Sequence, residues 1–162
     1  MAFPSLSIGD LTAKMPIVQG GMGVGISLSG LASAVANQGG IGVIAGAMIG
    51  MKEPDVAKNP IEANLRALRQ ELTKAREKTQ GIIGVNIMVA LTTFSQMVRT
   101  AIENRADIIF SGAGLPLEMP KHLLQACEEK KEEFKTKLVP IVSSARAATL
   151  IARKWLSRFD YL

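Results

Sequence analysis

Short apolar runs alternate with longer segments of helical periodicity along the whole chain, and this alternation constrains the fold more than any other feature. The runs are residues 16–19, 41–45, 82–88, 107–110 and 139–143. Two neighbouring parallel strands need a crossover of a dozen or more residues, usually a helix. Strands that alternate with helices therefore predict an α/β fold with a parallel sheet. The run at 139–142 lacks polar alternation, which predicts a strand buried on both faces.

The segments between the runs carry the signals of helices. A helix over residues 28–37 is predicted to stop at Gly39-Gly40, because glycine commonly terminates helices. Ser144 is predicted to cap the last helix, and residues 6–11 are expected to add a small hairpin. An apolar stripe at spacings of three and four marks the helix over residues 61–72, namely Ile61, Leu65, Leu68 and Leu72.

Periodicity alone does not decide between an open doubly wound sheet and a closed barrel. A (β/α)8 barrel takes about 250 residues, and this chain has 162. Five strand–helix units are too few to close such a barrel, whereas an open five-stranded sheet would be complete at this length. No linker or low-complexity segment divides the sequence, so we expect residues 1–162 to belong to one domain.

The composition excludes several classes of protein. Apolar residues make up 48% of the chain and charged residues 20%, which indicates a buried core and excludes disorder. The single cysteine, Cys127, and the single histidine, His122, exclude a disulfide framework and a cysteine or multi-histidine metal site. The net charge is +5, but acids and bases are interleaved, as at residues 128–133. We therefore expect no nucleic-acid partner.

A membrane span must be considered, because residues 15–51 carry no charge. Ten glycines interrupt this stretch, so no apolar run is long enough to cross a bilayer. The interpretation we favour is a strand–helix–strand unit that is buried on both faces. Residues 1–10 lack the basic and apolar regions of a signal peptide, and the cytoplasm is the expected location.

Glycine and small polar residues gather where the predicted strands end. Residues 19–25 read Gln-Gly-Gly-Met-Gly-Val-Gly, and glycines there let a flat or anionic ligand approach the backbone closely. The carboxyl ends of consecutive parallel strands are the usual position of a ligand site in barrels and in open sheets. Residues 40–45 match the G-x-G-x-x-A spelling of a dinucleotide site, but a helix precedes them, so we interpret the match as coincidence.

Asn86 is the most informative single residue, because its amide lies inside an apolar strand and must find partners. A heterocyclic ligand would supply them, although neighbouring backbone groups could do the same. Ser143 and Ser144 could equally be helix caps. His122 follows Pro120 at the start of a helix and is interpreted as a surface or capping residue, and Cys127 has acidic neighbours that disfavour a thiolate. The strand ends therefore offer no acid or base.

Four ordered motifs resemble one known family. The run "PIVQGGMGVGISLSGLASAVANQGGIGVIAGA", followed by "GVNIMV", "DIIFSGAG" and "VPIVSS", resembles the nitronate monooxygenases, formerly called 2-nitropropane dioxygenases. Their relatives include the FMN-dependent enoyl-ACP reductases. The resemblance covers essentially the whole chain and implies an α/β fold, the first five βα units of a TIM-type (β/α)8 barrel that is incomplete in this chain.

The resemblance also implies a cofactor, FMN, and the residues around it. Gly21, Met22 and Gly23 would form the loop beside the flavin ring, and Gly46 would lie near the ring. The Asn86 side chain would hydrogen-bond the flavin, and two further residues would line the same mouth, Gly112 and Ser143. Family members continue with a sixth strand, a Gly-Gly-His motif whose histidine is the acid/base, and phosphate-binding loops. None of these is in this sequence, so no catalytic residue is assigned.

The implied function is oxidation of an alkyl nitronate by a flavin that molecular oxygen reoxidises, with this chain inactive and binding FMN weakly or not at all. The first alternative is an FMN-dependent enoyl-ACP reductase, which would take an enoyl thioester. The second is a non-catalytic open-sheet module that oligomerises. In each case the exposed strand edges are expected to favour association into a homo-oligomer.

Overall fold

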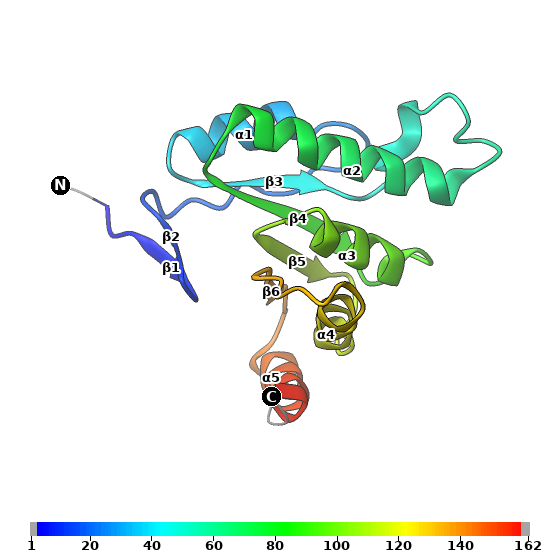
Figure 1. Ribbon diagram of the computed structural model, residues 1–162. Helices are drawn as coiled ribbons and strands as arrows, with labels where there is room; N and C mark the ends of the chain where they lie inside the picture. Colours follow the sequence, from blue (N-terminus) through cyan, green and yellow to red (C-terminus); the bar gives the residue numbers. More distant parts are fainter. Residues whose placement is uncertain (1–2, 160–162) are drawn as a thin grey trace.

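Four parallel strands form the centre of the molecule in a computed structural model, which describes residues 3–159. They lie in sequence order, and each is followed by a helix along the same side of the sheet (Figure 1). The predicted α/β fold with a parallel sheet is therefore confirmed. The strands are β3 (Ile41–Ala45), β4 (Ile82–Met88), β5 (Ile108–Gly112) and β6 (Lys137–Pro140). The helices are α1 (Ser29–Asn37), α2 (Pro60–Lys78), α3 (Phe94–Glu103), α4 (Met119–Lys130) and α5 (Ala145–Phe159), with a short 3-10 helix, η1 (Ile49–Lys52).

The sheet has two faces that bury different side chains. Successive residues of a strand point to opposite faces. Ile83, Val85 and Ile87 of β4 are fully buried in the cluster that includes side chains of α2 and α3. The alternate residues of β4 therefore face the other side, which we call the inner face. A second cluster lies on that face and includes Val43 and Phe110.

Helix α1 packs on β3 with almost no space between the backbones. A Cβ atom added to Gly42 would lie 1.8 Å from the carbonyl oxygen of Ala32. Only glycine fits there, so this residue fixes how closely the first helix approaches the sheet. Gly39 follows α1 in the left-handed region with a φ of 84°, and the helix therefore ends where the sequence predicted.

Glu71 of α2 supplies the cap that α1 lacks. Leu28, at the N-cap position of α1, makes no side-chain cap, and the buried Glu71 carboxylate accepts the N–H of Ser29 at 2.9 Å. Burial would raise the pKa of Glu71, but hydrogen bonds from Lys74 and Ser29 outweigh it and lower that pKa. A carboxylate at a helix N-terminus also interacts favourably with the helix dipole.

The predicted hairpin is present and lies at the amino ends of the strands. Strands β1 (Leu6–Ile8) and β2 (Leu11–Ala13) pair antiparallel across Gly9-Asp10. Their side chains pack against the inner-face cluster, and Asp10 forms an ion pair with Lys137 at the start of β6. The hairpin therefore covers the amino end of the inner face.

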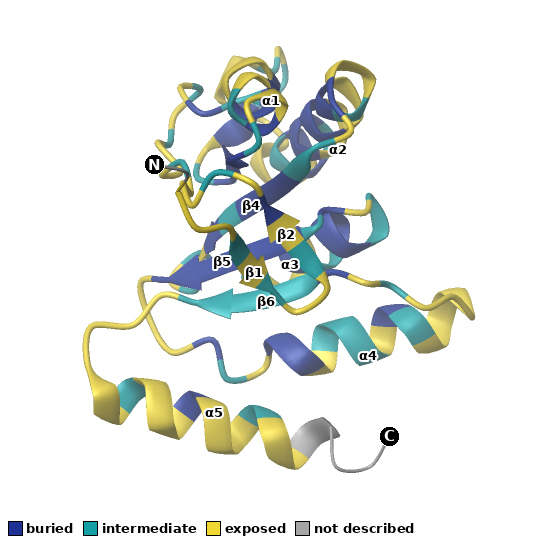
Figure 2. Cartoon of the chain, turned by 90° about the vertical axis from the view of Figure 1, so that its left-hand side faces the viewer, coloured by how far each residue is buried: buried dark blue, intermediate teal, exposed yellow. Residues whose placement is uncertain are grey.

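Two sequence predictions need correction. Residues 16–19 do not form a regular strand, because only one parallel bridge joins Val18 to Ile41. The last strand, β6, ends at Pro140 and is only half-buried, as its teal colour in Figure 2 shows. Ile141 beyond it is 52% exposed. The prediction of burial on both faces for residues 139–142 is therefore wrong. The physical reason is that β6 pairs with β5 and, among the described strands, with no other, so it forms the edge of the sheet.

Within residues 3–159, no helix combines the length and the hydrophobicity that a membrane crossing requires.

We predict that Glu71→Gln lowers the free energy of unfolding by about 1–2 kcal/mol, because a neutral amide interacts less with the α1 dipole. The folded-state pKa of Glu71 is lowered from 4.5. The stabilisation should therefore be complete above about pH 4.5 and disappear as the pH falls through the folded-state pKa. Urea unfolding of both proteins at several pH values measures this difference. The exposed Glu77 of the same helix provides the control variant, Glu77→Gln. Equal effects of the two substitutions at pH 7 would contradict this role of Glu71.

Candidate ligand site at the carboxyl ends of the strands

Asn86 presents a free amide on the inner face near the end of β4. It pairs in register with Ala45 and Phe110, in the row that faces away from the helices. The residue is half-buried, and its side chain makes no hydrogen bond to any other residue within 3–159. The alternative in which neighbouring backbone groups satisfy this amide is therefore wrong. Its donors and acceptor are available to a ligand.

Gly21 lies directly against Asn86. A Cβ atom added to Gly21 would lie 2.7 Å from the Asn86 Cβ atom, which is closer than atoms of this kind can approach. The absence of a side chain at Gly21 is what allows this contact. Gly46 adjoins the same residue, since its N–H donates to the Asn86 carbonyl oxygen at 2.8 Å. The structure thus brings together three residues that the sequence assigned to one site.

Met22 and Gly23 lie in the same loop as Gly21. The Met22 side chain is 46% exposed. A Cβ atom added to Gly23 would lie 3.2 Å from the Cβ atom of Ala47, in the segment that follows β3. The neighbouring Val24 donates its N–H to the carbonyl oxygen of Ala47 at 3.1 Å. The loop is therefore attached to the segment that follows Gly46.

Gly112 and Ser143 lie further along the same edge of the sheet. Gly112 pairs with Met88, two residues beyond Asn86 in β4. A shallow hollow of about 430 Å³ is lined by Ser143 and residues 113–115 that directly follow Gly112. Ser144 Oγ accepts the N–H of Ala147, so Ser144 is the predicted cap of α5. Gly112 and Ser143 therefore extend the candidate site along the edge of the sheet, away from Asn86.

Sequence reasoning missed Gln19 and Ser27, which hold the glycine-rich loop. Ser27 is fully buried, and its hydroxyl group accepts the Met22 N–H at 3.0 Å. Gln19 donates to the same hydroxyl group at 2.9 Å. The signal was present, because both are polar residues that flank the glycines. Their spacing alone, however, does not reveal that their side chains meet.

Few acids or bases occur in the described loops that directly follow the strands. Residues 89–93 and 141–144 contain no titratable side chain. The acids that follow η1, Glu53 and Asp55, both pair with Arg66. No group of three His, Cys, Asp or Glu side chains that could hold a metal occurs in this part of the chain. Lys52 of η1 lies beside the glycine-rich loop, since a Cβ atom added to Gly25 would lie 3.9 Å from Lys52 Nζ. The arrangement can bind and orient a ligand, with one cation beside the loop.

His122 and Cys127 both lie on α4, outside the inner face. The His122 ring meets Phe94 of α3 edge-on, with a centroid distance of 6.3 Å. Burial lowers the pKa of His122, and the neighbouring Lys121 lowers it further. His122 is half-buried against α3, and the N-cap position of α4 is Glu118, so only the capping part of the interpretation is wrong.

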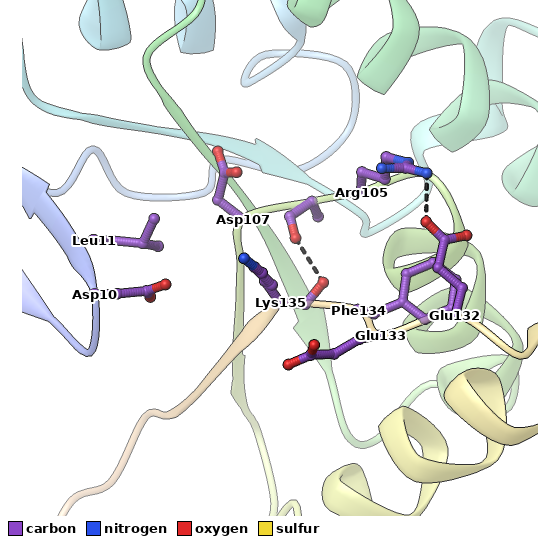
Figure 3. Close-up of a pocket in the computed structure, with 10 residues that line it drawn as sticks. Asp10, Leu11, Arg105, Asp107, Glu132, Glu133, Phe134 and Lys135 are labelled. Atoms are coloured by element: carbon purple, nitrogen blue, oxygen red, sulfur yellow. Dashed lines mark hydrogen bonds and ion pairs between the residues drawn. The ribbon is translucent and has the colours of Figure 1, made fainter.

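A hollow of about 430 Å³ lies at the opposite end of the sheet, between the hairpin turn and the loops before β5 and β6 (Figure 3). Its charged groups largely neutralise one another. Arg105 pairs with Glu132, and Asp107 accepts hydrogen bonds from Arg76 and from the Ile83 N–H. These interactions stabilise the loops at the amino ends of the strands. In barrels that end supports the fold, while ligands bind at the other end.

The solved structures that resemble this chain share its fold. FabK from Thermotoga maritima is 28% identical with a TM-score of 0.62, and the alignment covers 86% of this chain and 37% of FabK. A mutant of the same protein gives 26% identity and a TM-score of 0.65 over 86% of this chain and 40% of that one. Nitroalkane oxidase from Streptomyces ansochromogenes is 18% identical with a TM-score of 0.62, and the alignment covers 86% of this chain and 44% of the oxidase. The chain therefore spans about two fifths of the length of these proteins.

The fold is part of a TIM-type barrel, and the candidate site lies at the carboxyl ends of its strands. A family model described as nitronate monooxygenase matches residues 5–161. The chain belongs to the nitronate monooxygenase family, as its four motifs predicted. No curated protein sequence matches it.

We predict that Gly21→Ala lowers the free energy of unfolding by about 1–3 kcal/mol, because the added methyl group overlaps the Asn86 side chain. Gly20→Ala is the matched control, since a Cβ atom at Gly20 would meet nothing within 4 Å. Urea unfolding of the two variants measures the difference. A Gly21→Ala protein as stable as Gly20→Ala would show that the loop does not rest on Asn86.

Proposed function

We propose that this chain forms one wall of a flavin site in an FMN-dependent oxidoreductase. The observation that carries the proposal is the free amide of Asn86 beside Gly21, at the carboxyl end of a parallel strand. An amide offers both donors and an acceptor, which suits the polar edge of a flavin ring. The close approach of Gly21 leaves flat backbone surface next to it. Membership of the nitronate monooxygenase family supports the same ligand.

The residues fit the ring of FMN better than its phosphate. A bound FMN would supply the electron transfer, while Asn86 and Gly21 would orient its ring. A phosphate often binds at a helix N-terminus. In this chain the N-terminus of α1 already holds the Glu71 carboxylate. We therefore propose that residues 3–159 provide contacts to the ring and no anchor at α1 for the phosphate.

We propose an alkyl nitronate as the substrate, oxidised by the flavin with molecular oxygen as the final acceptor. The runner-up is reduction of an enoyl thioester, which the likeness to FabK favours. Oxygen uptake with a nitronate and NAD(P)H consumption with an enoyl thioester separate the two reactions. The 162-residue chain supplemented with FMN should show neither, because one wall of a site provides too few contacts to hold the flavin and a substrate together. A cytoplasmic location stays a prediction.

We predict that the purified chain binds FMN with a Kd on the order of 0.1–1 mM, because one wall without a phosphate anchor provides few contacts. Asn86→Ala should raise this Kd about fivefold to tenfold through loss of hydrogen bonds to the ring. Quenching of flavin fluorescence in a titration with protein measures both values.

The control is Asn104→Ala, which removes an amide that bonds to Thr100 at the end of α3. It should leave the Kd unchanged. Stoichiometric, tight binding by the wild-type chain would contradict the proposal that the phosphate anchor is missing. Equal FMN affinity of the Asn86→Ala and wild-type proteins would contradict the role of Asn86.

We also propose that the chain associates with a second copy through its sheet edges. Ile17 and Val18 are 53% and 42% exposed at one edge, and Ile141 and Val142 are 52% and 40% exposed at the other. Unpaired strand edges that carry apolar side chains readily pair with another chain.

Light scattering should give a mass above 17.3 kDa that rises with protein concentration. Ile141→Lys should shift the mass towards the monomer, because a charge at a strand edge opposes pairing. Ile61→Lys is the control, at an exposed position of α2 far in sequence from either edge. A monodisperse wild-type monomer at all concentrations would contradict association.

A further inference from the structure

The segment before the glycine-rich loop begins as a regular parallel ladder with β3. The Ile41 N–H donates to the Ile17 carbonyl oxygen at 2.9 Å, and the Gln19 N–H donates to the Ile41 carbonyl oxygen at 3.0 Å. In a parallel ladder the next bond would join the Val43 N–H to the Gln19 carbonyl oxygen. Instead, the Val43 N–H donates to Oε1 of the Gln19 side chain at 3.0 Å.

This exchange explains why residues 16–19 form only a bridge. A side-chain oxygen replaces the main-chain oxygen, so β3 keeps its hydrogen bond while the backbone after Gln19 leaves the ladder. The released residues are Gly20 and Gly21, and Gly21 comes to rest on Asn86 of β4. The chain thus crosses from the edge of β3 towards the next strand within two residues.

The other end of the Gln19 amide fixes the loop that has been released. Gln19 Nε2 donates to the Gly20 carbonyl oxygen at 2.6 Å and to Ser27 Oγ at 2.9 Å. Ser27 is tied to the sheet, since its carbonyl oxygen accepts the Ala45 N–H at 2.9 Å. Both donors and the acceptor of the Gln19 amide are therefore used, and both ends of the loop are attached to β3.

We propose that Gln19 is the positioning residue of this site, which holds the glycine-rich loop against Asn86 through its contacts with Val43 and Ser27. Its role in flavin binding rests on the proposed function, but its role in placing the loop does not. Glutamine suits this task because it combines an acceptor and two donors at sufficient reach. Glutamate would keep the acceptor and lose the donors, and methionine would lose both.

Hydrogen exchange of individual amides, followed by NMR, tests the placement without any ligand. In Gln19→Met the Val43 amide should exchange about tenfold faster, which corresponds to the loss of one hydrogen bond. In Gln19→Glu the Val43 amide should stay protected, while the Met22 amide becomes less protected, because a carboxylate oxygen cannot donate to the Gly20 carbonyl oxygen and would displace the loop. Amides of β5 should exchange at the wild-type rate in both variants, which excludes a general loss of stability.

Two matched controls complete the experiment. Gln38→Met changes an exposed glutamine and should alter neither amide. Ser33→Ala removes another buried serine, whose hydroxyl group bonds only within α1, and should leave the Met22 amide protected. Unchanged exchange at Val43 in Gln19→Met, or the same exchange pattern in the methionine and glutamate variants, would overturn the role of Gln19.

The same proteins then report on the flavin. If Gln19 positions the site, FMN should bind Gln19→Met about tenfold more weakly than the wild type and Gln38→Met equally well. A wild-type chain that binds no FMN would overturn the proposed function, and the exchange data would still decide how the loop is placed. Faster Val43 exchange with an unchanged FMN affinity would overturn the link between loop and ligand.

Discussion

The alternation of side chains along β4 is the constraint on which the rest of the structure depends. Ile83, Val85 and Ile87 are fully buried on the helix side of the sheet. A shift of the strand register by one residue would move all three to the other face and expose them. The packing of the helices therefore forces Asn86 to the inner face. The position of the candidate ligand site therefore follows from the hydrophobic core, because β4 cannot bury one face against the helices without turning Asn86 to the other face.

Much of the fold could be predicted from the sequence because its signals are local. The bounds of β3 and β4, the end of α1 beyond Asn37 and the Ser144 cap depend on runs, glycines and hydroxyl groups within a few residues. The predictions fail where residues distant in the sequence determine the hydrogen bonding or burial of a segment. The segment at 16–19 looks like a strand, but the Gln19 side chain takes over its hydrogen bond to β3. The burial of β6 depends on whether strands lie on both sides of it, and no local pattern in the sequence reveals that β6 is an edge strand.

The sequence likewise predicted the residues of the candidate site that carry local signals and missed those that depend on distant contacts. Asn86 stands out because an amide in an apolar strand requires a partner, and the glycines stand out because they cluster at strand ends. Which glycine touches Asn86 is decided by the path of the loop, and that path depends on Gln19 and Ser27. The pairing of Glu71 with the N-terminus of α1 joins residues 42 positions apart. Such contacts become visible only when the helices are placed on the sheet.

We propose that the amide of Asn86 faces a flavin, and the NMR signal of its side-chain NH2 group during addition of FMN tests this most directly. We expect this signal and that of the Gly21 amide to shift together and to saturate with the same Kd. Signals of the hollow at the amino ends, such as the Arg105 amide, should not move. If FMN shifts those signals and leaves the Asn86 side chain unchanged, the site lies elsewhere and the account is wrong.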